Sequence, residues 1–178
     1  MNSSIIVILF VEKLIERCMI QILEGTIVID DTEKFLQRLK KMSKEKNTAI
    51  QALNADKLAG EEHIRFAVEK AISSFEKGRN VSKDLAKEIM LYAAGTRQIN
   101  RAMRLGVHNG KNNIALVVIG EELEFKDIKP EHVLKYDSSK DDALMDIFNI
   151  TKEELQAVGE DKIPTLVLER VALVDVLK

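Results

Sequence analysis

The chain has 178 residues, of which 46% are hydrophobic, so it is long and apolar enough to form one sizeable core. Its net charge of −2 excludes polyanion binding through overall charge, and an aromatic content of 4% without Trp argues against a platform that stacks several bases. A lone cysteine, Cys18, excludes a disulfide framework and a cysteine-based metal site. We therefore expect an intracellular, cytoplasmic protein that holds no metal and no small-molecule cofactor.

Residues 1–18 are expected to be an extension to a single domain that covers residues 19–178. The apolar run at residues 5–11 is too short to span a membrane and lacks the pattern of a signal peptide, so no membrane association is expected. Met19 offers a second plausible start. Two interpretations of the extension stay open: an added strand or helix, or a start codon placed too early.

Secondary structure is predicted along the rest of the chain by periodicity and by capping residues. Isoleucines between Ile20 and Ile29, interrupted by Gly25, predict a strand, and Asp30-Asp31-Thr32 predicts the start of a helix over residues 33–46. The continuous apolar run at 114–119 is the best candidate for a central strand. Further expected elements are a strand at 48–53 and helices at 63–77, 140–148 (capped by Ser139), 152–158 (capped by Thr151) and 164–171 (opened by Pro164).

Strands and helices are mixed in this order without strict alternation. The predicted fold class is therefore α/β (α+β), a single domain in which α-helices pack on a small mixed β-sheet.

The stretch Leu85–Gly106 is the most informative part of the sequence. It predicts two helices joined at Gly95, with Ser82 capping the first and Thr96 capping the second. On the second helix, three arginines at i, i+4 and i+7 share one face, opposite an apolar face of Ile99, Ala102 and Met103. No acidic residue lies between positions 96 and 120 to neutralise the three arginines Arg97, Arg101 and Arg104.

This arginine stripe predicts a site for an anionic ligand, although a solvated helix face is the common role of such a pattern. The charge distribution favours the site: residues 79–104 carry six Lys and Arg against two acids, a net of +4, whereas residues 120–161 carry thirteen acids against five Lys, a net of −8. Leu105 is a candidate floor for a base pocket. The candidate RNA-binding residues are Lys83, Lys87, Thr96, Arg97, Gln98, Arg101, Arg104 and Leu105.

The C-terminal helix is apolar over more than one face, which is more than a terminal helix needs in order to dock on its own domain. Its candidate partner-binding residues are Leu166, Val167, Val171 and Val174. The alternative is a central helix that its own domain covers on both sides.

Catalytic motifs are missing from the sequence: it has no GxGxxG, Walker A, CxxC or HExxH pattern, and its paired carboxylates stand at helix starts or in a charged loop. We therefore expect no catalytic residue and no enzyme activity. An enzyme that holds a phosphate ester on Gly95-Thr96-Arg97 stays open as an alternative, but no general base stands between positions 92 and 104.

The chain resembles the small non-catalytic subunit of the KEOPS complex, the family of the PRPK-binding protein TPRKB. The resemblance lies in several segments in this order: IQALNAD, a helix ending in KG, KEIMLYAAGTRQINRAMRLGV, NNIALVVIGEE and IPTLVLERVALVDVL. The AxGxRQI core resembles the archaeal branch. The chain departs from archaeal relatives at Glu61-Glu62, where basic residues are usual. This departure removes support for an RNA contact at the start of that helix.

The resemblance implies an adaptor that binds a PRPK-type kinase/ATPase subunit and captures the single-stranded 3′ CCA end of tRNA. In that role it supports the threonylcarbamoyladenosine modification of tRNA. The alternative is a purely protein-binding regulator of an atypical kinase, in which the arginines meet an acidic protein surface.

Overall fold

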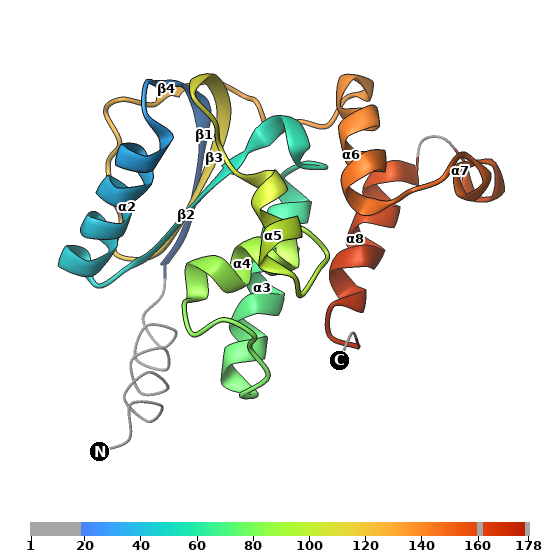
Figure 1. Ribbon diagram of the computed structural model, residues 1–178, viewed down its shortest axis with the longest axis horizontal. Coiled ribbons are helices and arrows are strands. Elements are labelled where there is room, and N and C mark those ends of the chain that lie inside the picture. Colours follow the sequence, from blue (N-terminus) through green and yellow to red (C-terminus); the bar gives the residue numbers. More distant parts are fainter. Residues whose placement is uncertain (1–18, 160–161, 177–178) are drawn as a thin grey trace.

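The structure, a computed structural model, describes residues 19–159 and 162–176. The proposed extension at residues 1–18 lies outside the described residues. Four strands form one sheet in the order β2-β3-β1-β4 (Figure 1). The strands are β1 (Met19–Ile29), β2 (Ala49–Asn54), β3 (Gly110–Gly120) and β4 (Lys129–Pro130).

The predicted fold class is confirmed, with one difference in the sheet. All neighbouring strands of the described sheet pair antiparallel, whereas a mixed sheet was expected. The longest ladder joins β1 to β3, from Met19 opposite Gly120 to Ile29 opposite Gly110. A two-residue edge strand with a proline, β4, closes the other side of β1, and proline is tolerated there because an edge strand can do without one donor.

The central strand β3 is buried on both faces, as its unbroken apolar run predicts. Ile114, Leu116 and Val118 belong to a core beneath helix α2 (Thr32–Lys46) and the loop at 121–128. The alternate residues Ala115 and Val117 belong to a larger core beneath the remaining helices. Because successive side chains of a strand point to opposite faces, one apolar run serves two cores.

Helices cover the second face of the sheet, with α7 projecting from it in Figure 1. The described α-helices there are α3 (Glu61–Glu76), α4 (Leu85–Ala93), α5 (Ile99–Ala102), α6 (Asp141–Phe148), α7 (Lys152–Val158) and α8 (Ile163–Leu173). Short 3₁₀ turns connect them at η1 (Ala55–Lys57), η2 (Met103–Leu105) and η3 (Ser138–Lys140). None of the described helices has the length and apolar composition needed to cross a membrane.

Helix caps confirm some predicted starts and correct others. Asp31 caps α2, and Thr151 forms a capping box with Glu154 at α7. Asp84, and not Ser82, caps α4, because its carboxylate reaches the amides of the first helical turn. Asp137, and not Ser139, caps the turn that leads into α6.

Gly25 does not interrupt the first strand. It lies inside β1, where a Cβ atom would stand 2.2 Å from the carbonyl oxygen of Lys129 on β4. The glycine therefore lets the edge strand approach closely.

The buried side chain of His63 joins α3 to the end of α4. Its Nδ1 accepts a hydrogen bond from the amide of Ala59 (3.1 Å), so the proton lies on Nε2, which donates to the carbonyl of Ala93 (2.7 Å). Desolvation lowers the pKa of His63 to about 4 from an ordinary value of 6.5.

The pKa of His63 predicts a pH dependence of stability. The neutral ring is favoured in the fold, so its contribution is complete above about pH 6.5 and is lost as the pH falls toward 4. We expect the free energy of unfolding to drop by about 3 kcal/mol across this window, on the scale of 1.36 kcal/mol per pKa unit. Urea titrations of wild type and His63→Gln test this. Parallel pH profiles for the two proteins would contradict it.

Candidate functional site

A tight turn at Gly95 positions the arginine stripe. Gly95 has φ 59°, and the amide of Thr96 donates back to the carbonyl of Leu91 at 3.1 Å, which ends α4. The helix that follows, α5, has only four residues and continues as the 3₁₀ turn η2. Arg97 therefore precedes the helix and Arg104 lies in the 3₁₀ turn, so the prediction that the three arginines share one face of a helix is wrong. Its N-cap is Gln98, so the predicted cap at Thr96 is wrong: the Thr96 hydroxyl accepts from the amide of Gln98 (3.2 Å) while the residue itself is buried.

Two of the three arginines in the stripe are available for a ligand. The side chains of Arg97 and Arg101 have no hydrogen-bond or ion-pair partner in the part of the chain that the structure describes, and Arg101 is exposed. Arg104 is ion-paired with Asp146 of α6. The expectation that no acid neutralises the stripe is therefore wrong for Arg104, because the acid comes from a helix 42 residues away in the sequence.

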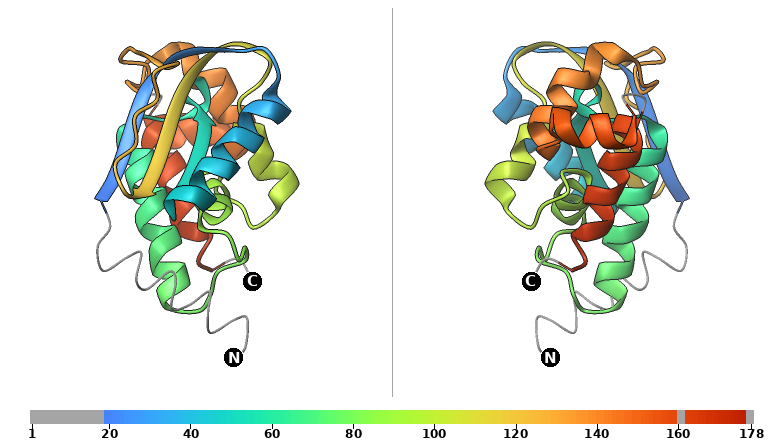
Figure 2. Two further views of the ribbon diagram at one scale, coloured as in Figure 1. Left: turned by 90° about the vertical axis from the view of Figure 1, so that its left-hand side faces the viewer. Right: turned by 90° about the vertical axis from the view of Figure 1, so that its right-hand side faces the viewer.

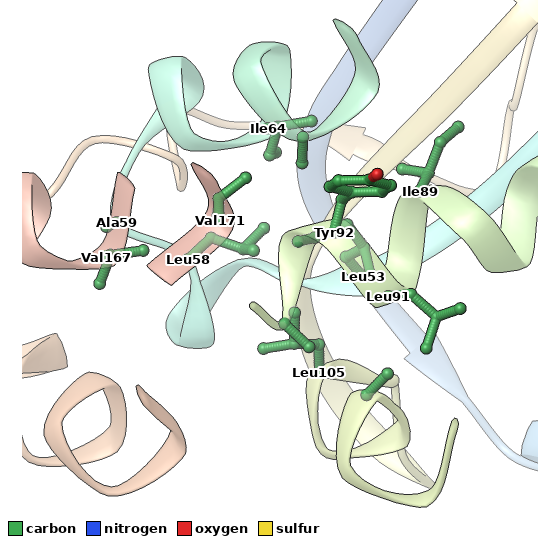
Figure 3. Packing of buried hydrophobic residues seen from close by; sticks show 14 of the residues in the cluster. Leu53, Leu58, Ala59, Ile64, Ile89, Leu91, Tyr92, Leu105, Val167 and Val171 are labelled. Atoms are coloured by element: carbon green, nitrogen blue, oxygen red, sulfur yellow. The ribbon is translucent and has the colours of Figure 1, made fainter. Parts of the chain in front are cut away.

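The face opposite the arginines is not the predicted apolar face. Ile99 and Met103 are exposed, whereas Ala102 and Leu105 are completely buried. The change from α-helix to 3₁₀ turn rotates the later residues out of the 3.6-residue period. Leu105 therefore packs in the core, close to Leu91 in Figure 3, and the prediction that it floors a base pocket is wrong.

A cavity of about 150 Å³ lies beside the turn, and its lining includes Gly95, Thr96 and Arg101. Arg170 of α8 lines it as well and donates to Glu154 (2.6 Å) and to the carbonyl of Phe148 (3.4 Å). The hydrogen bond from Arg170 holds the pKa of the Glu154 carboxyl below its ordinary value.

Arg170 also sets the need for glycine in the turn, since a Cβ at Gly95 would stand 3.0 Å from the Cβ of Arg170. Sequence reasoning did not identify Arg170, because no local pattern connects α8 to the turn.

The lysines near the candidate site are not the ones that were predicted. Both predicted lysines are exposed, with Lys87 in the first turn of α4 and Lys83 just before its N-cap, so the nine-residue helix, about 13 Å long at 1.5 Å per residue, lies between Lys83 and the Gly95 turn. Lys57, which sequence reasoning missed, lies next to the stripe and donates to the carbonyl of Arg104 (2.6 Å). Its place in the 3₁₀ turn after β2 became apparent only in three dimensions.

The four predicted partner-binding residues of α8 are buried inside their own domain. Val167 and Val171 are fully covered and lie near Ala59 and Leu58 in Figure 3. The structure thus corrects the predicted contact surface of Leu166, Val167, Val171 and Val174: α8 is a core helix, as the alternative held.

A different face of α8 forms a groove with α3. The groove has a volume of about 490 Å³ and an apolar floor of Phe66, Leu168 and Ala172. Charged side chains line its rim: Glu62, Arg65, Glu69 and Glu169. An apolar floor surrounded by a polar rim is the usual arrangement of a protein-binding surface.

The described residues contain no cluster of His, Cys, Asp or Glu that could hold a metal ion. The cavity beside Gly95 likewise has no acidic side chain or histidine among its lining residues. The arrangement thus places one exposed cation that has no partner among the described residues, Arg101, at a small polar cavity, which suits an anion.

Comparison with known proteins identifies the family of the chain. The family model described as kinase binding protein CGI-121 matches residues 26–175, and the chain belongs to this family of kinase-binding proteins. It is also similar to a protein of Methanocaldococcus jannaschii described as regulatory protein Cgi121. The identity is 29% over 137 residues, which cover 72% of this chain and 85% of that protein. The predicted family resemblance is thereby confirmed.

Burial on α8 gives a direct prediction about stability. Val167→Glu should abolish cooperative unfolding, because it places a carboxylate in a core without a partner. Leu168→Glu, one residue further on a half-buried groove position, should keep the fold and most of its stability. Thermal unfolding followed by circular dichroism measures both, and a folded Val167→Glu protein would show that α8 is not held in the core.

Proposed function

We propose that the protein is a non-catalytic adaptor that captures the single-stranded 3′ CCA end of tRNA on the arginine stripe. In this proposal it presents the tRNA to a KEOPS complex that makes threonylcarbamoyladenosine. The observation that carries the proposal is the pair of guanidinium groups at Arg97 and Arg101, which have no protein partner among the described residues; Arg101 also lines a polar cavity.

The dimensions of this site support a single-stranded ligand. An unpaired tail needs a few phosphate contacts and a surface for one or two bases, and guanidinium planes supply both. A cavity of about 150 Å³ is enough for part of one nucleotide, not for a duplex. Exposed Ile99 and Met103 stand next to the arginines and offer apolar contact to an unstacked base.

Kinase binding is the part of the function that the family supports directly. We propose that the PRPK-type kinase/ATPase subunit binds at the groove between α3 and α8. Two residues of its apolar floor, Leu168 and Ala172, belong to the C-terminal segment that the sequence singled out, although they are not the residues predicted there, and the third, Phe66, comes from α3. The groove and the cavity beside the arginine stripe are lined by different residues of α8, so both ligands can be held at once.

The competing function is that of a regulator which binds protein alone, with the arginines facing an acidic surface. The family description is compatible with it, and tRNA titrations distinguish the two. A protein that binds its kinase but shows no tRNA affinity at low salt is such a regulator.

The tRNA site is tested by Arg97→Ala and Arg101→Ala in filter-binding titrations over a range of salt concentrations. Each lost phosphate contact should lower the slope of log affinity against log salt by roughly 0.7, the value for single strands. Removal of the CCA end from the tRNA should weaken binding far more than removal of the anticodon arm.

Arg79→Ala is a matched control for these variants, since it removes the same charge in the loop before α4 and has been assigned no role in RNA binding. Unchanged affinity and salt slope in the Arg97 and Arg101 variants would contradict the proposed tRNA site. Equal effects of the two tRNA truncations would contradict it as well.

The kinase site is tested by Leu168→Glu and Phe66→Ala in pull-downs with the purified kinase subunit. Both variants should lose kinase binding, because they place a charge on the groove floor or remove its largest apolar surface. They should keep the tRNA affinity of the wild type. Leu36→Glu on α2 is the control, since Leu36 is an exposed leucine outside the groove. Retained kinase binding in both groove variants would place the partner elsewhere.

A further inference from the structure

The exposed face of helix α2 carries a second concentration of positive charge. Between Thr32 and Lys46 the helix has six Lys and Arg against two Glu, a net of +4 in a protein of net −2. Three of the six have acidic neighbours: Arg38 pairs with Asp127, Lys34 with Asp31 and Lys41 with Glu45. The other three have no partner among the described residues and are Lys40, Lys44 and Lys46.

Requirements of the fold do not account for Lys40 and Lys44. The helix attaches to the sheet through Phe35 and Leu39, which are buried, while both lysines are exposed. Like charges four residues apart on a helix destabilise it by a few tenths of a kcal/mol. The helix dipole offsets this for Lys44 in the last turn, but not for Lys40, which lies one turn earlier.

Helix α2 is connected to the arginine stripe through the segment that follows Arg104. Val107 packs against the core that contains Phe35 and Leu39. The side chain of Asn109 accepts hydrogen bonds from the amide (2.8 Å) and the hydroxyl (2.6 Å) of Thr32 at the start of α2. Helix α2 packs on one face of the sheet and α5 on the other; both lie on the right-hand side of the view in Figure 2 (left), and in Figure 1 strand β2 passes between them.

We propose that Lys40 and Lys44 bind backbone phosphates of an RNA duplex whose single-stranded end lies on the arginine stripe. This proposal rests on the proposed function and extends it from the tail to the adjoining duplex. The difference in residue type supports it: arginine can stack on unpaired bases, whereas lysine is a compact point charge suited to phosphates alone. Contacts of this kind carry no sequence information and set the orientation of the RNA.

The test compares two RNA probes on the intact protein. One is a short single-stranded oligoribonucleotide that ends in CCA, and the other is a hairpin that carries the same tail. The double variant Lys40→Ala/Lys44→Ala should bind the oligonucleotide like wild type. It should bind the hairpin roughly tenfold more weakly near 100 mM salt and with a lower salt slope, because each lost phosphate contact reduces the release of counterions.

Lys126→Ala/Lys152→Ala is the matched control, because it removes the same charge from exposed lysines in the acidic part of the chain. It should leave binding of both probes unchanged. The α2 variant should also unfold at the same temperature as wild type or higher, since it removes a repulsion and introduces a strong helix former.

The outcomes separate this proposal from the tail site. Wild-type affinity of the α2 variant for the hairpin, or an equal loss with both probes, overturns the duplex contact. A hairpin loss equal to that of the Lys126/Lys152 control also overturns it, because the effect is then one of net charge. The tail site is judged by a different measurement: it fails if wild-type protein does not bind the oligonucleotide at low salt, whatever the α2 variant does.

Discussion

Burial of β3 on both faces is the constraint on which the rest of the structure depends. Its six central apolar residues are completely shielded from solvent and divide between two separate cores. Each core in turn requires a cover, which is α2 and the 121–128 loop on one side and the helical layer on the other. A strand of this kind cannot lie at an edge or face water, so the order of the sheet and the number of layers follow from it.

Buried charged side chains stabilise the loops that connect these layers. Glu88 of α4 accepts hydrogen bonds from the amides of Val81 and Ser82, which fixes the loop after α3. Lys140 donates to the carbonyls of Ala55 and Val133 from inside the domain. Both side chains are buried, and each compensates for the loss of water by binding backbone groups that would otherwise lack partners.

Glycine at position 95 connects the core to the candidate RNA site. The left-handed turn ends α4 in the core and starts α5 at the surface, while close contact with Arg170 fixes its distance from α8. The position of the arginines that follow is thus set by this turn, although α5 itself has only four residues. Acidic side chains are grouped in the later part of the chain. There Asp146 pairs with Arg104 of the stripe and Glu154 pairs with Arg170 beside it, which leaves Arg97 and Arg101 available.

Local sequence patterns determined three of the four described strands, most helix starts and the family. Some signals act over only a few residues, so they can be recognised in the sequence without a structure. These are the apolar run of β3, the Asp31 cap, the capping box at Thr151 and Pro164 in the first turn of α8. The AxGxRQI segment likewise identified the turn and the arginines. Only the tertiary structure decided which apolar side chains face solvent and which arginines are neutralised. Val167 proved to be core and Arg104 met Asp146 because burial and ion pairing depend on elements that are distant in the sequence, and periodicity carries no information about them.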